Sequence, residues 1–185
     1  MEESIEKISF NNKVRDAKIE ELSDRILELE RKDSEKKIEL HGVEERDGEK
    51  LEEVVIGVVG KLNIRLETAD IDQVYRQKKR QTDRDRHIVV QFVSGKKCNE
   101  IKNKKRTNIT NRDIMRNGTD NKIFIYEHLS SFYKKLFWDA KQRARNADWK
   151  YVWIQNGHIF ARKNDGSKIF QVRQAKDLDR IEAVH

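Results

Sequence analysis

The chain has 185 residues, enough for one domain of ordinary size or two small ones. Charged residues make up 39% of the chain and hydrophobic residues 36%, whereas globular domains are typically about 25% charged. This composition argues against an enzyme built around one large core. No stretch approaches the roughly 18 consecutive apolar residues of a membrane span, and with one cysteine, Cys98, no disulfide can form within the chain. We therefore expect an intracellular protein, cytoplasmic or nuclear, without a membrane span.

The net charge of +7 is unevenly distributed. Residues 1–70 carry 13 Lys and Arg and 20 Asp and Glu, whereas residues 71–185 carry 27 and 13. Between Arg76 and Arg116 alone, 14 residues are basic and 4 are acidic. Such a local excess of cations is typical of a surface that binds a polyanion such as nucleic acid.

Apolar residues recur every seven positions in the first part of the chain. One register holds Ile5, Asn12, Ile19 and Ile26, and the other holds Ile8, Arg15, Leu22 and Leu29. These are the a and d positions of a heptad repeat, so the pattern predicts a helix that joins copies of itself in a parallel coiled coil. A single helix that folds back on the rest of the chain is the alternative.

The number of strands in the coiled coil depends on two conflicting signals. Ile at a with Leu at d favours a dimer. Arg25 and Glu30, however, flank Ile26 and Leu29 in the Arg-h-x-x-h-Glu pattern of short parallel trimers, where h is hydrophobic, and we favour a trimer over a dimer. The expected oligomerisation residues are Ile19, Leu22, Arg25, Ile26, Leu29 and Glu30.

Strands and helices are then predicted in the order β-α-β-β-α-β. Period-2 alternation predicts strands at 37–43, 71–79, 87–93 and 122–126, and helical spacing predicts helices at 51–62 and 96–106. This order is the split βαβ arrangement of RRM and ferredoxin-like folds. An ordinary RRM stacks RNA bases on aromatics of its central strands, but the corresponding positions here hold His87, Val89 and Glu39. We therefore predict no stacking platform, and binding that depends mainly on phosphate contacts and hence on salt.

A smaller basic lobe is predicted at the end of the chain. It has a helix at 130–147, strands at 149–155 and 158–163 joined by the turn Asn156-Gly157, and a third strand at 168–172. We interpret its aromatics, Trp149, Tyr151, Trp153, Phe160 and Phe170, as core and not as stacking platforms. The fold class is therefore α+β, with a coiled-coil helix at 1–36, an RRM-like domain at 37–128 and a helix-plus-hairpin lobe at 129–185.

The candidate nucleic-acid contacts are basic residues from three parts of the chain. Each charge run could also be only a solvated loop, but two runs of the same sign favour a binding surface. The candidates are Arg76, Lys78, Lys79, Arg80, Arg84 and Arg86; then Lys104, Lys105, Arg106, Arg112 and Arg116; and finally Arg162 and Lys163.

This order of parts resembles the baculovirus few-polyhedra (FP) protein family and, related to it, the first-open-reading-frame RNA-binding proteins of LINE-type retrotransposons. The segments that carry the resemblance are Ile38–Glu45, Val74–Arg76, Arg86–Phe92, Ile125–Ser130 and Tyr151–Ile159, followed by Arg162-Lys163 and Ser167-Lys168. The resemblance implies a self-associating protein with nucleic-acid chaperone behaviour that binds single-stranded RNA between its two folded lobes. By position, the resemblance implies that the RNA is contacted above all by Arg76, Arg86, Arg162 and Lys163.

The charge distribution, the heptads and the motifs bear on three classes of function. The leading hypothesis is a non-enzymatic oligomer that binds single-stranded RNA, or DNA, with weak sequence preference. The alternative is a viral or host scaffold that uses its coiled coil and basic surface to bind proteins. Catalysis is not expected, because the histidines stand in no HExxH or zinc-deaminase context and no phosphate-cradling glycine loop is present. We accordingly expect no catalytic residues, no metal site and no cofactor.

Overall fold

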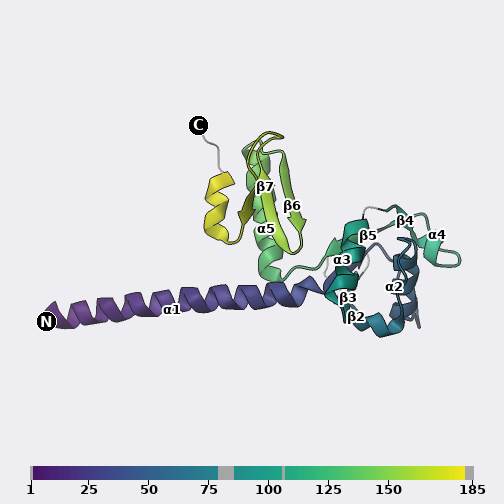
Figure 1. Cartoon of the computed structure of the whole chain (residues 1–185), viewed down its shortest axis with the longest axis horizontal. Helices are drawn as coiled ribbons and strands as arrows, with labels where there is room; N and C mark the ends of the chain where they lie inside the picture. Colours follow the sequence, from purple (N-terminus) through teal and green to yellow (C-terminus); the bar gives the residue numbers. More distant parts are fainter. Residues whose placement is uncertain (1, 79–85, 106, 182–185) are drawn as a thin grey trace. The chain divides into compact units, whose positions relative to one another are not determined.

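The structure is a computed structural model, and it describes residues 2–78, 86–105 and 107–181. Helices and strands are both abundant (Figure 1), so the mixed class predicted from the sequence is confirmed. The chain divides into two compact units, residues 1–33 and 34–185. None of the helices in the described residues has the length and apolar character needed to span a bilayer.

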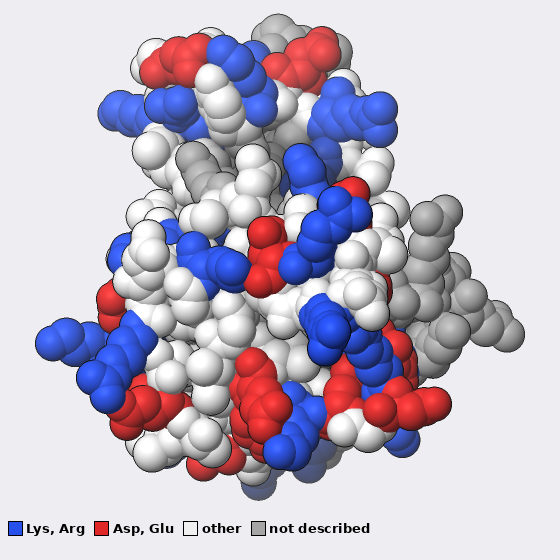
Figure 2. All heavy atoms as spheres, turned by 90° about the vertical axis from the view of Figure 1, so that its right-hand side faces the viewer, with Lys and Arg blue, Asp and Glu red and all other residues white. Residues whose placement is uncertain are grey.

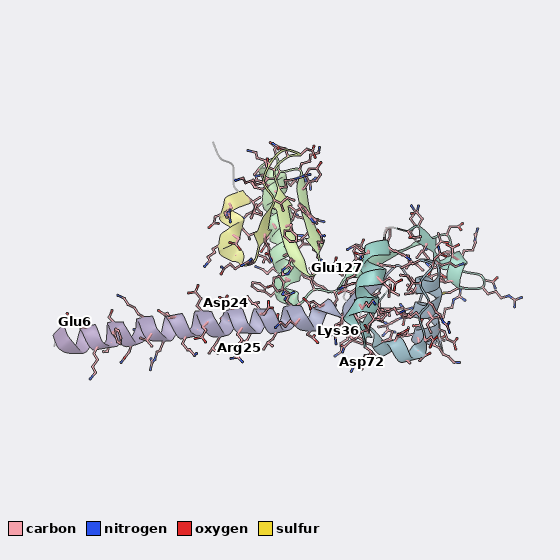
Figure 3. The ribbon with its side chains drawn as sticks, viewed as in Figure 1. Glu6, Asp24, Arg25, Lys36, Asp72 and Glu127 are labelled. Carbon is pink, nitrogen blue, oxygen red and sulfur yellow. The ribbon has the colours of Figure 1, made fainter. Side chains whose placement is uncertain are left out.

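The first unit consists of the long helix α1 (Glu2–Glu35), which runs through the predicted heptads. Its side chains line the ribbon in Figure 3. The apolar seam is open to solvent, with Ile19 62%, Leu22 47%, Ile26 55% and Leu29 59% exposed. The long helix is thus confirmed, and the association of its copies stays a prediction.

The second unit begins with a five-stranded antiparallel sheet. Its strands are β1 (Lys37–His41), β2 (Ile71–Arg76), β3 (Ile88–Phe92), β4 (Ile109–Thr110) and β5 (Lys122–Glu127), in the order β2-β3-β1-β5-β4. The connecting elements are α2 (Leu51–Gly60), the 3-10 helix η1 (Thr68–Asp70), α3 (Gly95–Lys104) and α4 (Asn111–Ile114).

The core of this part forms where one face of the sheet packs against the helices. Ile38 and Leu40 of β1 and Phe92 of β3 join Val58 of α2 and Ile101 of α3, and none of these side chains is more than 1% exposed. Because side chains alternate along a strand, the intervening residues of β1 and β3 lie on the other face. That second face carries the candidate site described below.

β4 and α4 lie within 107–121, where the sequence analysis predicts neither a helix nor a strand. Asn111, which is fully buried, organises this segment. Its side-chain amide donates to the carbonyl oxygens of Gly42 at 2.8 Å and Asn121 at 3.0 Å, and its Oδ1 accepts the Glu44 N–H at 2.9 Å. A polar residue can therefore anchor a buried segment that hydrophobic periodicity does not reveal.

The C-terminal elements build a second core around α5 (Ser131–Asn146). Ser130 caps this helix by accepting the Tyr133 N–H, and Leu136 and Ala140 lie one turn apart on the face that is buried. Three strands, β6 (Tyr151–Gln155), β7 (His158–Arg162) and β8 (Phe170–Val172), form an antiparallel sheet, and the 3-10 helix η2 (Ala175–Ile181) packs beside it.

The β6–β7 connection is the hairpin that the sequence predicts. Asn156 and Gly157 both have positive φ, 53° and 72°, as the two-residue turn that matches strand twist requires. The two hydrophobic cores contain residues 38–125 and 129–181 respectively. The three-part division itself stays a prediction.

Candidate nucleic-acid interface

The face of the five-stranded sheet that points away from α2 and α3 is rich in aromatic rings. Register places Tyr126 of β5 opposite Glu39 of β1, and Phe124 opposite His41. At the β2 edge of the sheet, on the same face, Tyr75 of β2 pairs with Val89 of β3. The side chains of Tyr75, Phe124 and Tyr126 are 43%, 49% and 49% exposed, so they offer ring surface to a ligand.

Phe124 and Tyr126 form a connected layer with two histidine rings. His41 stacks on His87 with ring centroids 4.4 Å apart and planes 9° apart, and Tyr126 meets His41 edge-on at 4.9 Å. Phe124 stacks on Tyr126 at 6.2 Å. We call Tyr75, His87, His41, Phe124 and Tyr126 the aromatic face.

The prediction of a sheet without a stacking platform overlooked these exposed rings. It considered only the central positions, which do hold Glu39, His87 and Val89. The rings come instead from β2 and β5, the strands on either side of the central pair β1 and β3. The exposed–buried alternation of β5, with Phe124 and Tyr126 between Ile123 and Ile125, was a signal that could have revealed them.

The carboxylate of Glu39 lies among the polar groups of this face although it is only 4% exposed. Oε1 lies 2.7 Å from Nδ1 of His128 and 2.6 Å from Nζ of Lys134, while Oε2 lies 2.9 Å from Nε2 of His41. Because an ionised carboxylate only accepts hydrogen bonds, each of these nitrogens donates. Burial by itself raises the pKa of Glu39, but the hydrogen bonds from His128, His41 and Lys134 outweigh burial and hold the pKa well below its usual range.

A second buried carboxylate, Glu127, stands at the end of β5 (Figure 3). Its Oε1 accepts from Nζ of Lys105 at 2.8 Å, and its Oε2 accepts the backbone N–H of Gly157 at 2.8 Å. Glu127 thus joins the end of α3 to the β6–β7 turn, and Glu39 joins β1 to α5 through Lys134. Two carboxylates therefore connect the five-stranded sheet to the C-terminal lobe.

Three shallow hollows follow one another from the sheet to that lobe. Lys105 lines both the first and the second hollow, and Trp153 lines both the second and the third. We call this series of hollows the inter-lobe path. Its side chains include Lys122, Phe124, Tyr126 and Lys105, then Lys102, Trp153 and Gln155, and lastly Lys150, Tyr151 and Arg162.

The far end of the inter-lobe path runs over the outer face of the three-stranded sheet. Trp153 stacks on Phe160 at 5.7 Å, and the guanidinium of Arg162 lies 4.6 Å above the Tyr151 ring. These three aromatics alternate with Val152, Ile154, Ile159 and Ala161, which face the core. The interpretation of the lobe's aromatics as core is thus correct for Trp149 and Phe170, which pack against the core, and wrong for Tyr151, Trp153 and Phe160.

Arg76, expected to bind phosphate, is a structural residue instead. Its side chain is 4% exposed, and it forms a two-pronged ion pair with Glu49. Its remaining N–H groups donate to the carbonyl oxygens of Arg86 at 2.6 Å, Glu44 at 2.9 Å and Val43 at 3.2 Å. All five guanidinium donors are used, which leaves none for a ligand.

Several other predicted contacts also hold carboxylates. Arg86 pairs with Glu45, Arg112 with Asp120 at 3.0 Å, Lys105 with Glu127 at 2.8 Å and Arg162 with Asp165 at 3.4 Å. Among the residues that the structure describes, the face of the molecule in Figure 2 shows Lys and Arg interspersed with Asp and Glu.

The remaining predicted contacts fall into three groups. Lys105 and Arg162 line the inter-lobe path, and Lys78, Lys104, Arg116 and the half-buried Lys163 line none of its hollows. Lys79, Arg80, Arg84 and Arg106 lie outside the described residues. The predicted oligomerisation residues Arg25 and Glu30 are exposed on α1, and their pairing between copies stays a prediction.

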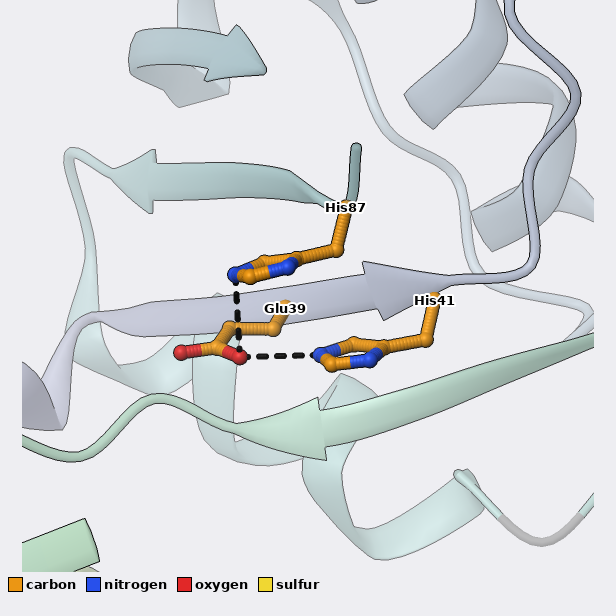
Figure 4. Close-up of side chains that lie close together, drawn as sticks. All are labelled: Glu39, His41 and His87. Carbon is orange, nitrogen blue, oxygen red and sulfur yellow. Dashed lines mark hydrogen bonds and ion pairs between the residues drawn. The ribbon is translucent and has the colours of Figure 1, made fainter. Parts of the chain in front are cut away.

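The sequence analysis also missed a cluster of side chains of the kind that ligate metal ions. Glu39, His41 and His87 bring three potential ligand atoms within 4.8 Å of one another (Figure 4). Glu39 and His41 share a face of one strand, a spacing visible in the sequence, but His87 joins them only because β3 pairs with β1.

Comparison with known families assigns the C-terminal lobe. Residues 130–182, which span α5, the three-stranded sheet and η2, match the model of Baculovirus FP protein domain 2. The C-terminal lobe of the chain is thus similar to domain 2 of the baculovirus FP proteins. The expected resemblance to that family is thereby confirmed, whereas the relation to retrotransposon proteins stays a prediction. No curated protein matches the chain.

Replacing Arg76 by alanine should destabilise the fold without weakening nucleic-acid binding. Removing one partner of a buried ion pair costs about 3 kcal/mol or more, which urea unfolding of the variant would measure. Lys78→Ala, two residues away and exposed, is the matched control and should change the free energy of unfolding by less than about 0.5 kcal/mol. A stable Arg76→Ala variant with impaired RNA binding would restore Arg76 as a contact.

Replacing Glu39 by glutamine should lower the free energy of unfolding by about 2 kcal/mol at pH 7, because charged hydrogen bonds are lost. Since the pKa of Glu39 is depressed in the folded state, its stabilisation is fully present above its ordinary pKa of 4.5 and declines as the pH falls below that value. The difference between wild type and variant in urea unfolding should therefore shrink below pH 4.5. Glu53→Gln, on the exposed face of α2, serves as control; a pH-independent difference for Glu39→Gln would contradict the assignment.

Proposed function

We propose that this protein is a non-enzymatic oligomer that binds single-stranded nucleic acid, in the first place RNA, along the inter-lobe path. The observation that carries the proposal is the exposed Phe124–Tyr126 stack, from which Lys105 leads to the second aromatic group at Trp153. Exposed rings beside lysines are what single-strand binding requires, because bases stack on the rings while the cations follow the phosphates.

The arrangement changes the expected balance of forces. Base–aromatic stacking contributes about 1–3 kcal/mol per base and tolerates any sequence. Many of the arginines expected to supply phosphate contacts hold carboxylates of their own chain. Stacking on the aromatic face and at Trp153 therefore supplies a share of the affinity that the sequence analysis assigned mainly to phosphate contacts.

We also propose that the five-stranded sheet with α2 and α3 is an RRM-like domain. The order β1-α2-β2-β3-α3-β5 and the strand order β2-β3-β1-β5 support this assignment, since they follow the split βαβ arrangement. In this proposal β4 is an addition at the edge beside β5.

Self-association would multiply the sites. The exposed heptad seam of α1 supports a parallel coiled coil, with a trimer favoured over a dimer. Several moderate sites on one assembly raise the effective concentration for a long strand, which suits a chaperone-like protein of weak sequence preference. If no nucleic acid binds, the same seam supports the alternative, a protein-binding scaffold.

The double variant Phe124→Ala/Tyr126→Ala should bind a single-stranded RNA oligonucleotide at least tenfold more weakly in a fluorescence anisotropy titration. The slope of log K against log salt should stay unchanged, because stacking releases no counterions. Trp138→Ala is the matched control, since this ring is 61% exposed on α5 and lies outside the inter-lobe path. Unchanged affinity in the double variant would remove the aromatic face from the site.

Replacing both Ile26 and Leu29 by serine should convert the oligomer into a monomer, because two seam positions then lose their apolar contact between copies. Sedimentation equilibrium gives the mass and distinguishes a trimer from a dimer in the wild type. Val14→Ser, an equally exposed residue outside the seam, should leave the mass unchanged. A wild-type chain that sediments as a monomer would rule out the coiled coil.

A further inference from the structure

We propose that Glu39, His41 and His87 form a binding site for one zinc ion on the outer face of the five-stranded sheet. The site goes beyond the proposed function and does not depend on it, because its evidence is the mutual position of three side chains. It also gives a role to two imidazoles and a carboxylate that lie close together on neighbouring strands.

The carboxylate oxygen of Glu39 is spaced from both imidazole nitrogens as a small ion requires. Oε2 of Glu39 lies 2.9 Å from Nε2 of His41 and 3.5 Å from Nε2 of His87, and all three atoms lie within 4.8 Å of one another (Figure 4). Tetrahedral zinc, with bonds of about 2.0–2.2 Å to nitrogen and oxygen, separates its ligand atoms by roughly 3.3 Å. The distances from Oε2 of Glu39 to the two imidazole nitrogens, 2.9 Å and 3.5 Å, lie just below and just above this separation.

Binding requires one change in the rings. The two imidazoles are stacked with planes 9° apart, and parallel rings cannot both direct a lone pair at the same point. His41 has room to tilt, because its side chain is 39% exposed. The side chain of His87 is only 17% exposed and has less room to move. The ion then replaces the proton shared between His41 and Glu39, which binding releases.

The surroundings prepare the carboxylate for this role. His128 and Lys134 donate to Oε1 of Glu39, which fixes the orientation of the group and leaves Oε2 directed at the two imidazoles. Partners of this kind in the outer shell orient the ligands of metal sites. Two imidazoles and one carboxylate are also a donor set that zinc uses in proteins, with a fourth position left for water or a ligand.

The test is the binding of Zn²⁺ to the full chain without an affinity tag, measured by competition with a chromophoric chelator. We expect one ion per chain with a dissociation constant below about 10 µM, and visible absorption bands when Co²⁺ replaces Zn²⁺. His41→Ala and His87→Ala should each weaken binding at least tenfold. His158→Ala, a histidine of β7 in the other sheet, is the matched control and should bind as the wild type does.

Folding is checked in parallel, because Zn²⁺ should raise the melting temperature of the wild type and of His158→Ala, but not of the double variant His41→Ala/His87→Ala. All three proteins should show the same circular dichroism spectrum without metal. Absence of stoichiometric Zn²⁺ binding, or binding that the double variant retains at wild-type affinity, would overturn the proposal.

Discussion

Glu39 is a charge placed inside the polar face of a sheet, and the arrangement of the second unit depends on how that charge is neutralised. A buried carboxylate is costly unless hydrogen bonds compensate it. Here the hydrogen bonds come from His41 on the same strand, from His128 after β5 and from Lys134 of α5, and His87, just before β3, lies 3.5 Å from the carboxylate. One carboxylate thus fixes the rings of the aromatic face and attaches the lobe that follows.

Glu127 is a second buried carboxylate held by hydrogen bonds, on the face of β5 opposite to Phe124 and Tyr126. Ile123 and Ile125, with the same orientation, enter the core, while Phe124 and Tyr126 between them face outward. One short strand therefore supplies the core, the exposed rings and, through Glu127, the link to the β6–β7 turn. Because one strand serves these three roles, few apolar residues are needed, and a chain that is 39% charged can still position aromatic groups in two separate sheets.

Local patterns predict what depends on local spacing. The long helix α1, the buried face formed by Ile38 and Leu40, and the Asn156-Gly157 turn are all predicted correctly from the sequence. β4 and α4 were missed because a buried amide, Asn111, replaces apolar periodicity there. The site residues were predicted less well, because a run of positive charge does not reveal which cations already have partners in the fold. The donors of Arg76, for example, are occupied by Glu49 and by backbone carbonyl groups from other parts of the chain.

The central claim of this account is that a single strand passes over Phe124 and Tyr126 and continues along β6. Photochemical cross-linking of a single-stranded RNA oligonucleotide to the full chain, followed by mass spectrometry of the peptides, tests it directly. The account predicts cross-links within residues 122–127 and 151–155. Cross-links confined to α2, on the opposite face of the sheet, would contradict it.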